Sequence, residues 1–153
     1  MADGRILSLR LVVSDLDRSL TFYADAFGLR EVGRAEMSDP NVEEAFLEDP
    51  SGARLLVLIR GDRYAVPVSH GWAPLAMVVS DIEQARADVE NAGGRLAVQP
   101  KNLGPVTVFM AVDPDGYLVE VAAGDLSVLD DLEGQTSKGQ RMPHPMPEIH
   151  EPY

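Results

Sequence analysis

The stretch Val12-Val13-Ser14-Asp15-Leu16-Asp17 recurs 66 residues later as Val78-Val79-Ser80-Asp81-Ile82-Glu83. A second pair follows in the same order, because Asp49-Pro50-Ser51-Gly52 recurs 64 residues later as Asp113-Pro114-Asp115-Gly116. Two matches at nearly equal offsets indicate an internal duplication. The chain is therefore predicted to contain two copies of one structural unit.

Each copy begins with an apolar run that is typical of a β-strand and leads into a helix. These runs span residues 6–13 and 75–79. Ser80 with Glu83 three residues later has the form of a capping box, and Ser14 with Asp17 is a weaker version of it. We therefore predict that each helix starts at this serine.

The helices themselves are predicted from apolar residues at spacings of three and four. Leu16, Leu20, Tyr23 and Phe27 form such a series in the first copy, and the same spacing runs from residue 82 to residue 92 in the second. Gly28 suits the left-handed cap that ends many helices.

Three extended segments follow each predicted helix. They span residues 29–35, 42–48 and 54–60 in the first copy and residues 95–98, 106–112 and 117–123 in the second. Each Asp-Pro-x-Gly sequence separates the last two segments and predicts a hairpin turn, since Pro fixes φ and Gly accepts a positive φ. Each copy is thus predicted as strand, helix and three strands.

The domain organisation follows from this repeat. We expect a first module at residues 1–60, a linker at 61–72 and a second module at 73–124, together forming one structural domain. Residues 125–153 are charged and carry four prolines, Pro143, Pro145, Pro147 and Pro152. Such a segment contributes little to a core, so we predict an acidic tail that is either extended over a neighbouring surface or disordered.

The composition narrows the range of functions. The 153 residues carry 13 basic and 25 acidic side chains, a net charge of −12, and no cysteine. The acidic field disfavours nucleic acids, and the lack of cysteine excludes disulfides and thiolate metal sites. No signal-peptide pattern and no membrane-length apolar run is present, so we expect a cytoplasmic protein with no membrane partner.

The repeat resembles the vicinal oxygen chelate superfamily of glyoxalases, bleomycin-resistance proteins and extradiol dioxygenases. The resemblance rests on the strand-to-helix passage VSDLDRSLTFY at residues 13–23 and the closing hairpin DPDGYLVEV at residues 113–121, and it covers about residues 5–123. It implies an α+β fold in which two βαβββ modules form a curled mixed sheet with a cleft. One fold can serve many functions, so the resemblance is less specific for activity.

Metal-dependent members of that superfamily place ligands at four recurring strand positions. Counted from the two motifs, the resemblance puts these positions at Ser8, Leu56, Pro74 and Glu120. Only Glu120 is a good ligand for a divalent metal, whereas catalytic metal sites typically need about three protein ligands. We therefore expect no metal and no other cofactor. A shifted site that uses His70 with Glu120 is the alternative.

Strand alternation predicts which charged side chains point into the expected cleft. Glu120 points to the other side of its strand from the adjacent apolar residues. Arg10 shares a face with Ser8 and Val12. Glu120 is either neutralised by Arg10 or acts as a ligand acceptor or general base. Arg10 is either that partner or a clamp for an anionic group. We expect Arg54 to join this network.

The remaining predicted lining is mostly apolar. Leu56, Pro74 and Ala76 belong to it through their strand positions, and Trp72 is either a rim residue or a structural anchor. A four-residue turn would place Phe109 opposite Glu120, where it would either stack on a planar ligand or pack in the core.

Three functions fit these observations. The first is binding of an aromatic or amphipathic small molecule, cationic ones included, without metal chemistry, as in the antibiotic-sequestering members of the superfamily. The second is catalysis as a lyase, isomerase or dioxygenase, with a displaced metal or with Glu120 as acid or base. The third is a regulatory or accessory module. The acidic charge and the missing ligands favour the first.

We predict that the protein is a homodimer. Members of this superfamily commonly pair modules between chains, and open sheet edges favour such pairing. Light scattering at micromolar concentration should give the mass of two chains, and the mass of one chain would contradict the prediction. Deletion after Gly124 should weaken the dimer if the tail lies across the partner, and an unaffected dimer would refute only this role.

Overall fold

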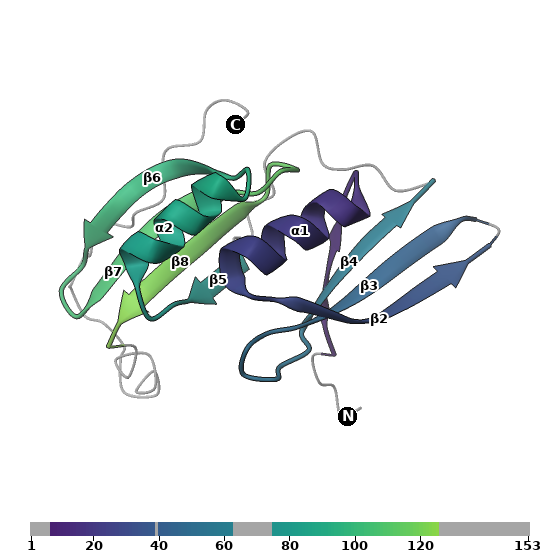
Figure 1. The fold of residues 1–153 in the computed structure, drawn as a ribbon, viewed down its shortest axis with the longest axis horizontal. Helices are drawn as coiled ribbons and strands as arrows, with labels where there is room; N and C mark the ends of the chain where they lie inside the picture. Colours follow the sequence, from purple (N-terminus) through teal and green to yellow (C-terminus); the bar gives the residue numbers. More distant parts are fainter. Residues whose placement is uncertain (1–6, 39, 63–74, 126–153) are drawn as a thin grey trace, which may run out of the picture. The chain divides into compact units, whose positions relative to one another are not determined.

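The structure is a computed structural model that describes residues 7–38, 40–62 and 75–125. The chain divides into two compact units, residues 1–68 and 69–153. Each unit contains a strand, a helix and three further strands, so the predicted βαβββ repeat is confirmed (Figure 1). Neither of the two helices in the described residues is long and apolar enough to cross a membrane.

The first unit forms a four-stranded mixed sheet. Its elements are β1 (Leu9–Val12), α1 (Leu16–Phe27), β2 (Arg30–Met37), β3 (Val42–Glu48) and β4 (Leu56–Gly61). The strand order is β1-β4-β3-β2, in which β1 runs parallel to β4 and the other neighbours are antiparallel. The first and last strands of the unit therefore lie side by side.

The second unit repeats this topology. Its elements are β5 (Leu75–Val78), α2 (Ile82–Asn91), β6 (Arg95–Asn102), β7 (Val106–Val112) and β8 (Leu118–Gly124). The order is β5-β8-β7-β6, again with one parallel pair, β5 and β8 (Figure 1). The predicted α+β fold is therefore confirmed, with one four-stranded sheet in each unit.

The helix starts need a correction of one residue. The N-caps are Asp15 and Asp81, not the serines before them: the Asp15 carboxylate accepts the backbone N–H of Arg18, and Asp81 accepts those of Glu83 and Gln84. A carboxylate satisfies the first unpaired N–H groups and also interacts favourably with the helix dipole. Gly28 does end α1, with a left-handed φ of 70°.

Helix α1 covers one face of the first sheet. That face carries Leu11, Ala45 and Leu58, which are paired across neighbouring strands and are all buried. Arg34 lies opposite Ala45, and its guanidinium reaches Asp17 on α1 at 3.5 Å, which places the helix on this side. The opposite face of the sheet, called here the Arg10 face, is not covered by α1.

The hairpin between β7 and β8 has a longer turn than predicted. The backbone N–H of Asp113 donates to the carbonyl of Tyr117, so that Val112 pairs with Leu118 rather than with Tyr117. The Asp113 carboxylate stabilises the extra residue by accepting the N–H groups of Asp115 and Tyr117. The one-residue difference changes which β7 side chains share a face with those of β8.

Phe109 is the residue that this correction affects. It pairs with Val121, and the residue opposite Glu120 is Met110. Phe109 is fully buried with Val121 on the face away from Glu120. The prediction that Phe109 lies beside Glu120 is therefore wrong, and its role is core packing.

The first hairpin has the same turn but a different register beyond it. The N–H of Asp49 donates to the carbonyl of Ala53, yet the nearest strand pair is Leu47 with Leu56. Two residues, Arg54 and Leu55, therefore lie opposite Glu48, which is the arrangement of a β-bulge. The last strand of the first unit is shifted by one residue relative to that of the second.

The buried turn residue Asp113 offers a test of this register. Asp113→Ala leaves two backbone N–H groups without their acceptor and should lower the free energy of unfolding by about 1–3 kcal/mol. Asp113→Asn keeps an acceptor oxygen and should lose less. Urea unfolding of the three proteins measures the difference, and equal losses would show that these hydrogen bonds do not stabilise the turn.

Candidate functional site

The Arg10 face gathers several of the predicted side chains in the first unit. Register and alternation place Arg10 beside Val57 and Val12 beside Ile59, and they place Phe46 across from Val57. The face consists of Ser8, Arg10, Val12, Arg30, Glu44, Phe46, Glu48, Arg54, Val57 and Ile59. Charged side chains thus surround a small apolar area.

Arg10 has a carboxylate partner that strand alternation alone does not identify. Its Nε lies 3.3 Å from Oε1 of Glu44, and its Nη1 donates to the Ser8 hydroxyl at 2.8 Å. The Glu44 side chain is only 13% exposed. Within the first unit the partner of Arg10 is therefore Glu44, and the pairing with Glu120 that the sequence suggested stays a prediction. Glu44 lies two strands away, so only the strand order could have revealed it.

A second buried carboxylate, Glu48, lies between two arginines. Its Oε1 forms an ion pair with Arg30, and its Oε2 accepts from Nε of Arg54 at 2.6 Å. The Glu48 side chain is 8% exposed, whereas those of Arg30 and Arg54 are 71% and 66% exposed. The hydrogen bonds from Arg54 and then Arg30 lower the pKa of Glu48, so the carboxylate stays ionised despite its burial.

In the second unit, Glu120 lies on β8 between Ala76 and Met110. These residues pair across β5, β8 and β7, so their side chains share one face. Glu120 is half-buried, and the next residue on this face of β5, Val78, is 68% exposed. Within residues 75–125, no side chain forms an ion pair or hydrogen bond with Glu120. Within this part of the chain, the carboxylate therefore lies beside apolar side chains.

The sequence-predicted residues divide into three groups. Ser8, Arg10 and Val12 share the Arg10 face, as predicted by alternation, and Ala76 lies beside Glu120. Arg54 reaches the Arg10 face through the bulge. Leu56 and Phe109 are buried on the opposite faces of their sheets, because both hairpin registers differ from the predicted ones. Trp72 and Pro74 lie outside the described residues.

The residues that sequence reasoning missed are Arg30, Glu44 and Glu48. Both glutamates lie on β3, separated by four residues and therefore on one face. This even spacing within the run Val42-Glu43-Glu44-Ala45-Phe46-Leu47-Glu48 was the available signal.

The register also tests the expected metal positions. Glu120 pairs with Ala76 in the second unit, and the corresponding position beside Arg10 in the first unit is Val57, not Leu56. Val57 offers no donor atom, and the Ser8 hydroxyl already accepts a hydrogen bond from Arg10. Among the described residues, no three His, Asp or Glu side chains are grouped closely enough to hold a metal ion. The donors that the described residues supply do not fit a catalytic metal.

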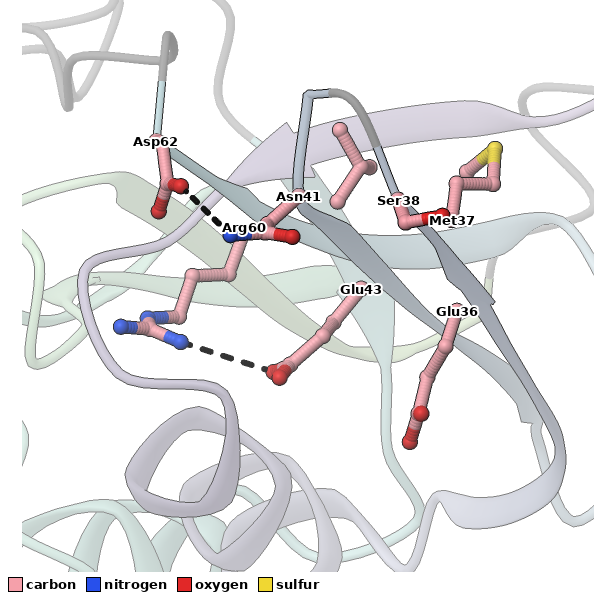
Figure 2. A pocket seen from close by; sticks show the side chains of 8 residues that line it. Glu36, Met37, Ser38, Asn41, Glu43, Arg60 and Asp62 are labelled. Carbon is pink, nitrogen blue, oxygen red and sulfur yellow. Dashed lines mark hydrogen bonds and ion pairs between the residues drawn. The ribbon is translucent and has the colours of Figure 1, made fainter.

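A polar hollow of about 570 Å³ lies elsewhere in the first unit, where the β2–β3 connection meets the end of β4 (Figure 2). Glu43 and Arg60 approach to 3.6 Å there, and Asn41 donates to Asp62 at 2.9 Å. Glu43 is 41% exposed and Arg60 51%, so solvent weakens their interaction. We place the candidate site on the Arg10 face instead, because its carboxylates are much more buried.

Glu48 leads to a pH-dependent prediction. Because Arg54 and Arg30 lower its pKa in the folded protein, folding favours the ionised form. This contribution is present above the ordinary glutamate pKa of about 4.3 and is lost as the pH falls through the lower folded-state value. Glu48→Gln should therefore destabilise the protein at neutral pH, and its difference from wild type should shrink in acid.

Urea unfolding at neutral pH and at about pH 3 measures this difference. Glu90→Gln, on the exposed side of α2, is the matched control and should have little effect at either pH. A stability loss for Glu48→Gln that is the same at both pH values would contradict an ionised Glu48.

Comparison with known proteins agrees with this architecture. Lactoylglutathione lyase from Haemophilus influenzae is 32% identical over 123 residues, which cover 76% of this chain and 90% of that protein. Two solved structures share the fold: a glyoxalase family protein from Bacillus cereus has a TM-score of 0.68 at 21% identity, over 81% of this chain and 98% of that one. The fosfomycin resistance protein FosX from Listeria monocytogenes has a TM-score of 0.64 at 20% identity, over 83% and 98%.

The family follows from the extent of the match. Residues 5–121 match the Glyoxalase/Bleomycin resistance protein/Dioxygenase superfamily, and this range includes both βαβββ units except for the end of β8. The chain therefore belongs to the glyoxalase, bleomycin resistance protein and dioxygenase superfamily.

Proposed function

We propose that this protein binds a small aromatic or amphipathic molecule on the sheet faces that carry Arg10 and Glu120, and that it does so without a metal. The observation that carries the proposal is the donor set. The hydroxyl of Ser8 and the side chain of Val57 occupy strand positions where metal-dependent members need ligands, and neither supplies a suitable one. Glu120 alone cannot hold a catalytic metal.

The same faces have the mixed character of a small-molecule site. Such sites are largely apolar with a few well-placed polar groups. In the first unit the half-buried Phe46 lies among paired charges, and in the second unit Glu120 lies beside the exposed Ala76. A carboxylate next to exposed apolar surface suits an amphipathic ligand, including one with a cationic group.

A second candidate function is catalysis, and the similarity to lactoylglutathione lyase favours it. In that case Glu120 is the acid or base, because it is a half-buried carboxylate that no side chain within residues 75–125 occupies. The two candidates differ in a measurable way. Binding alone predicts that ligands raise the melting temperature without turnover, whereas catalysis predicts formation of lactoylglutathione or a related product that Glu120→Gln abolishes.

Metal content provides the direct test. Protein purified without a histidine tag should contain far less than one Zn, Ni, Mn or Fe per chain, since the donor set lacks enough ligands. Elemental analysis of wild type, Glu120→Gln and the control Glu90→Gln measures this. About one metal ion per chain in wild type and in the control, lost only in Glu120→Gln, would overturn the metal-independent proposal.

A further inference from the structure

The Arg10 face carries an excess of positive charge within a strongly acidic protein. Three guanidinium groups, those of Arg10, Arg30 and Arg54, interact there with only two carboxylates. The chain as a whole has a net charge of −12. A local cationic group is therefore needed for any anion to approach this protein favourably.

The arginines on either side of Glu48 are held by a buried group. Each carboxylate oxygen of Glu48 contacts a different arginine, one at the start of β2 and one in the bulge before β4. A long flexible side chain normally loses conformational entropy when it binds a ligand. Because Glu48 already restricts Arg30 and Arg54, that loss is reduced, which is the general advantage of a preorganised site.

Most of the donors of these two arginines remain directed to solvent. A guanidinium has five N–H donors, and Glu48 takes one from each arginine, through Nη2 of Arg30 and Nε of Arg54. Both side chains are about two-thirds or more exposed, at 71% and 66%. The planar arrangement of these donors matches the oxygens of a carboxylate, sulfonate or phosphate.

An apolar surface adjoins this pair of arginines. Phe46 precedes Glu48 by two residues on β3, so both side chains point to the same side, about 7 Å apart along the strand. Phe46 pairs with Gly33 on β2, where a β-carbon added to the glycine would lie 3.8 Å from Cδ2 of the ring, so the ring lies along the glycine. Phe46 is half-buried, whereas its neighbour on β4, Val57, is only 2% exposed, so Phe46 supplies the accessible apolar surface.

We propose that Arg30 and Arg54, positioned by Glu48, bind the oxyanion group of an amphipathic ligand whose apolar part lies on Phe46. This inference rests on the proposed small-molecule function and adds a chemical class to it: a ligand that carries a carboxylate, sulfonate or phosphate. Glu48 is a positioning residue in this arrangement, because it does not contact the ligand itself.

Two fluorescent probes of similar apolar size separate the contribution of the oxyanion group to binding from that of the apolar part. 8-Anilinonaphthalene-1-sulfonate carries a sulfonate, whereas N-phenyl-1-naphthylamine is neutral. Arg30→Gln and Arg54→Gln should each raise the dissociation constant of the sulfonate probe by about tenfold, and should leave that of the neutral probe nearly unchanged. Added salt should weaken binding of the sulfonate probe to wild type and should have less effect on its binding to either variant.

Matched variants control for charge and for folding. Arg86→Gln on α2 removes one positive charge from another ion-paired arginine and should leave both probes unaffected. Arg30→Lys and Arg54→Lys keep a cation beside Glu48 and preserve the fold. Because they lose the planar donor group, they should still weaken binding of the sulfonate probe. Circular dichroism confirms that each variant is folded.

The outcomes distinguish the two proposals. Equal sulfonate affinity in wild type and in the folded Arg30 and Arg54 variants, with the neutral probe still bound, overturns only the oxyanion site. Failure of both probes to bind wild type overturns this inference together with the proposed binding function. If Arg86→Gln lowers the affinity for the sulfonate probe as much as the Arg30 and Arg54 variants do, the effect is one of general charge. That result also overturns the proposed oxyanion site.

Discussion

The parallel pairing of the first and last strands in each unit is the constraint on which the rest of the structure depends. In the first unit β1 pairs with β4, and in the second β5 pairs with β8. A parallel pair needs a long crossover connection, which here consists of a helix and two strands. The pairing therefore joins the two ends of the unit. The same pairing brings Arg10 beside Val57 and Ala76 beside Glu120, so it defines both candidate surfaces.

The register within these strand pairs determines which side chains lie on each candidate surface, which the fold alone does not. Because side chains alternate between the two faces of a strand, a shift of one residue exchanges a core position for a surface position. The bulge of Arg54 and Leu55 opposite Glu48 produces such a shift in the first unit. It puts Val57 where the second unit has Glu120, and it brings Arg54 to a buried carboxylate.

Buried carboxylates give the Arg10 face its character. Removing a glutamate from water is costly unless cations and hydrogen bonds compensate for the lost hydration. Glu48 meets this requirement with two arginines and Glu44 with one, and these arginines keep much of their surface in solvent. One architecture can serve several activities, so the function of this chain depends on local arrangements such as this one.

The amino-acid sequence by itself determined the repeat, the order of elements and the faces of single strands, because apolar spacing, alternation and the Asp-Pro-x-Gly turns are local patterns. Only the tertiary structure decided which side chains meet. The longer turn moved Phe109 into the core, and strand order brought Glu44 to Arg10 and two arginines to Glu48. These ion-paired residues are separated by between 6 and 34 positions in the chain. Their meeting depends on strand order and on one-residue register shifts, which arise from hydrogen-bond geometry in turns and bulges and leave no periodic signal in the sequence.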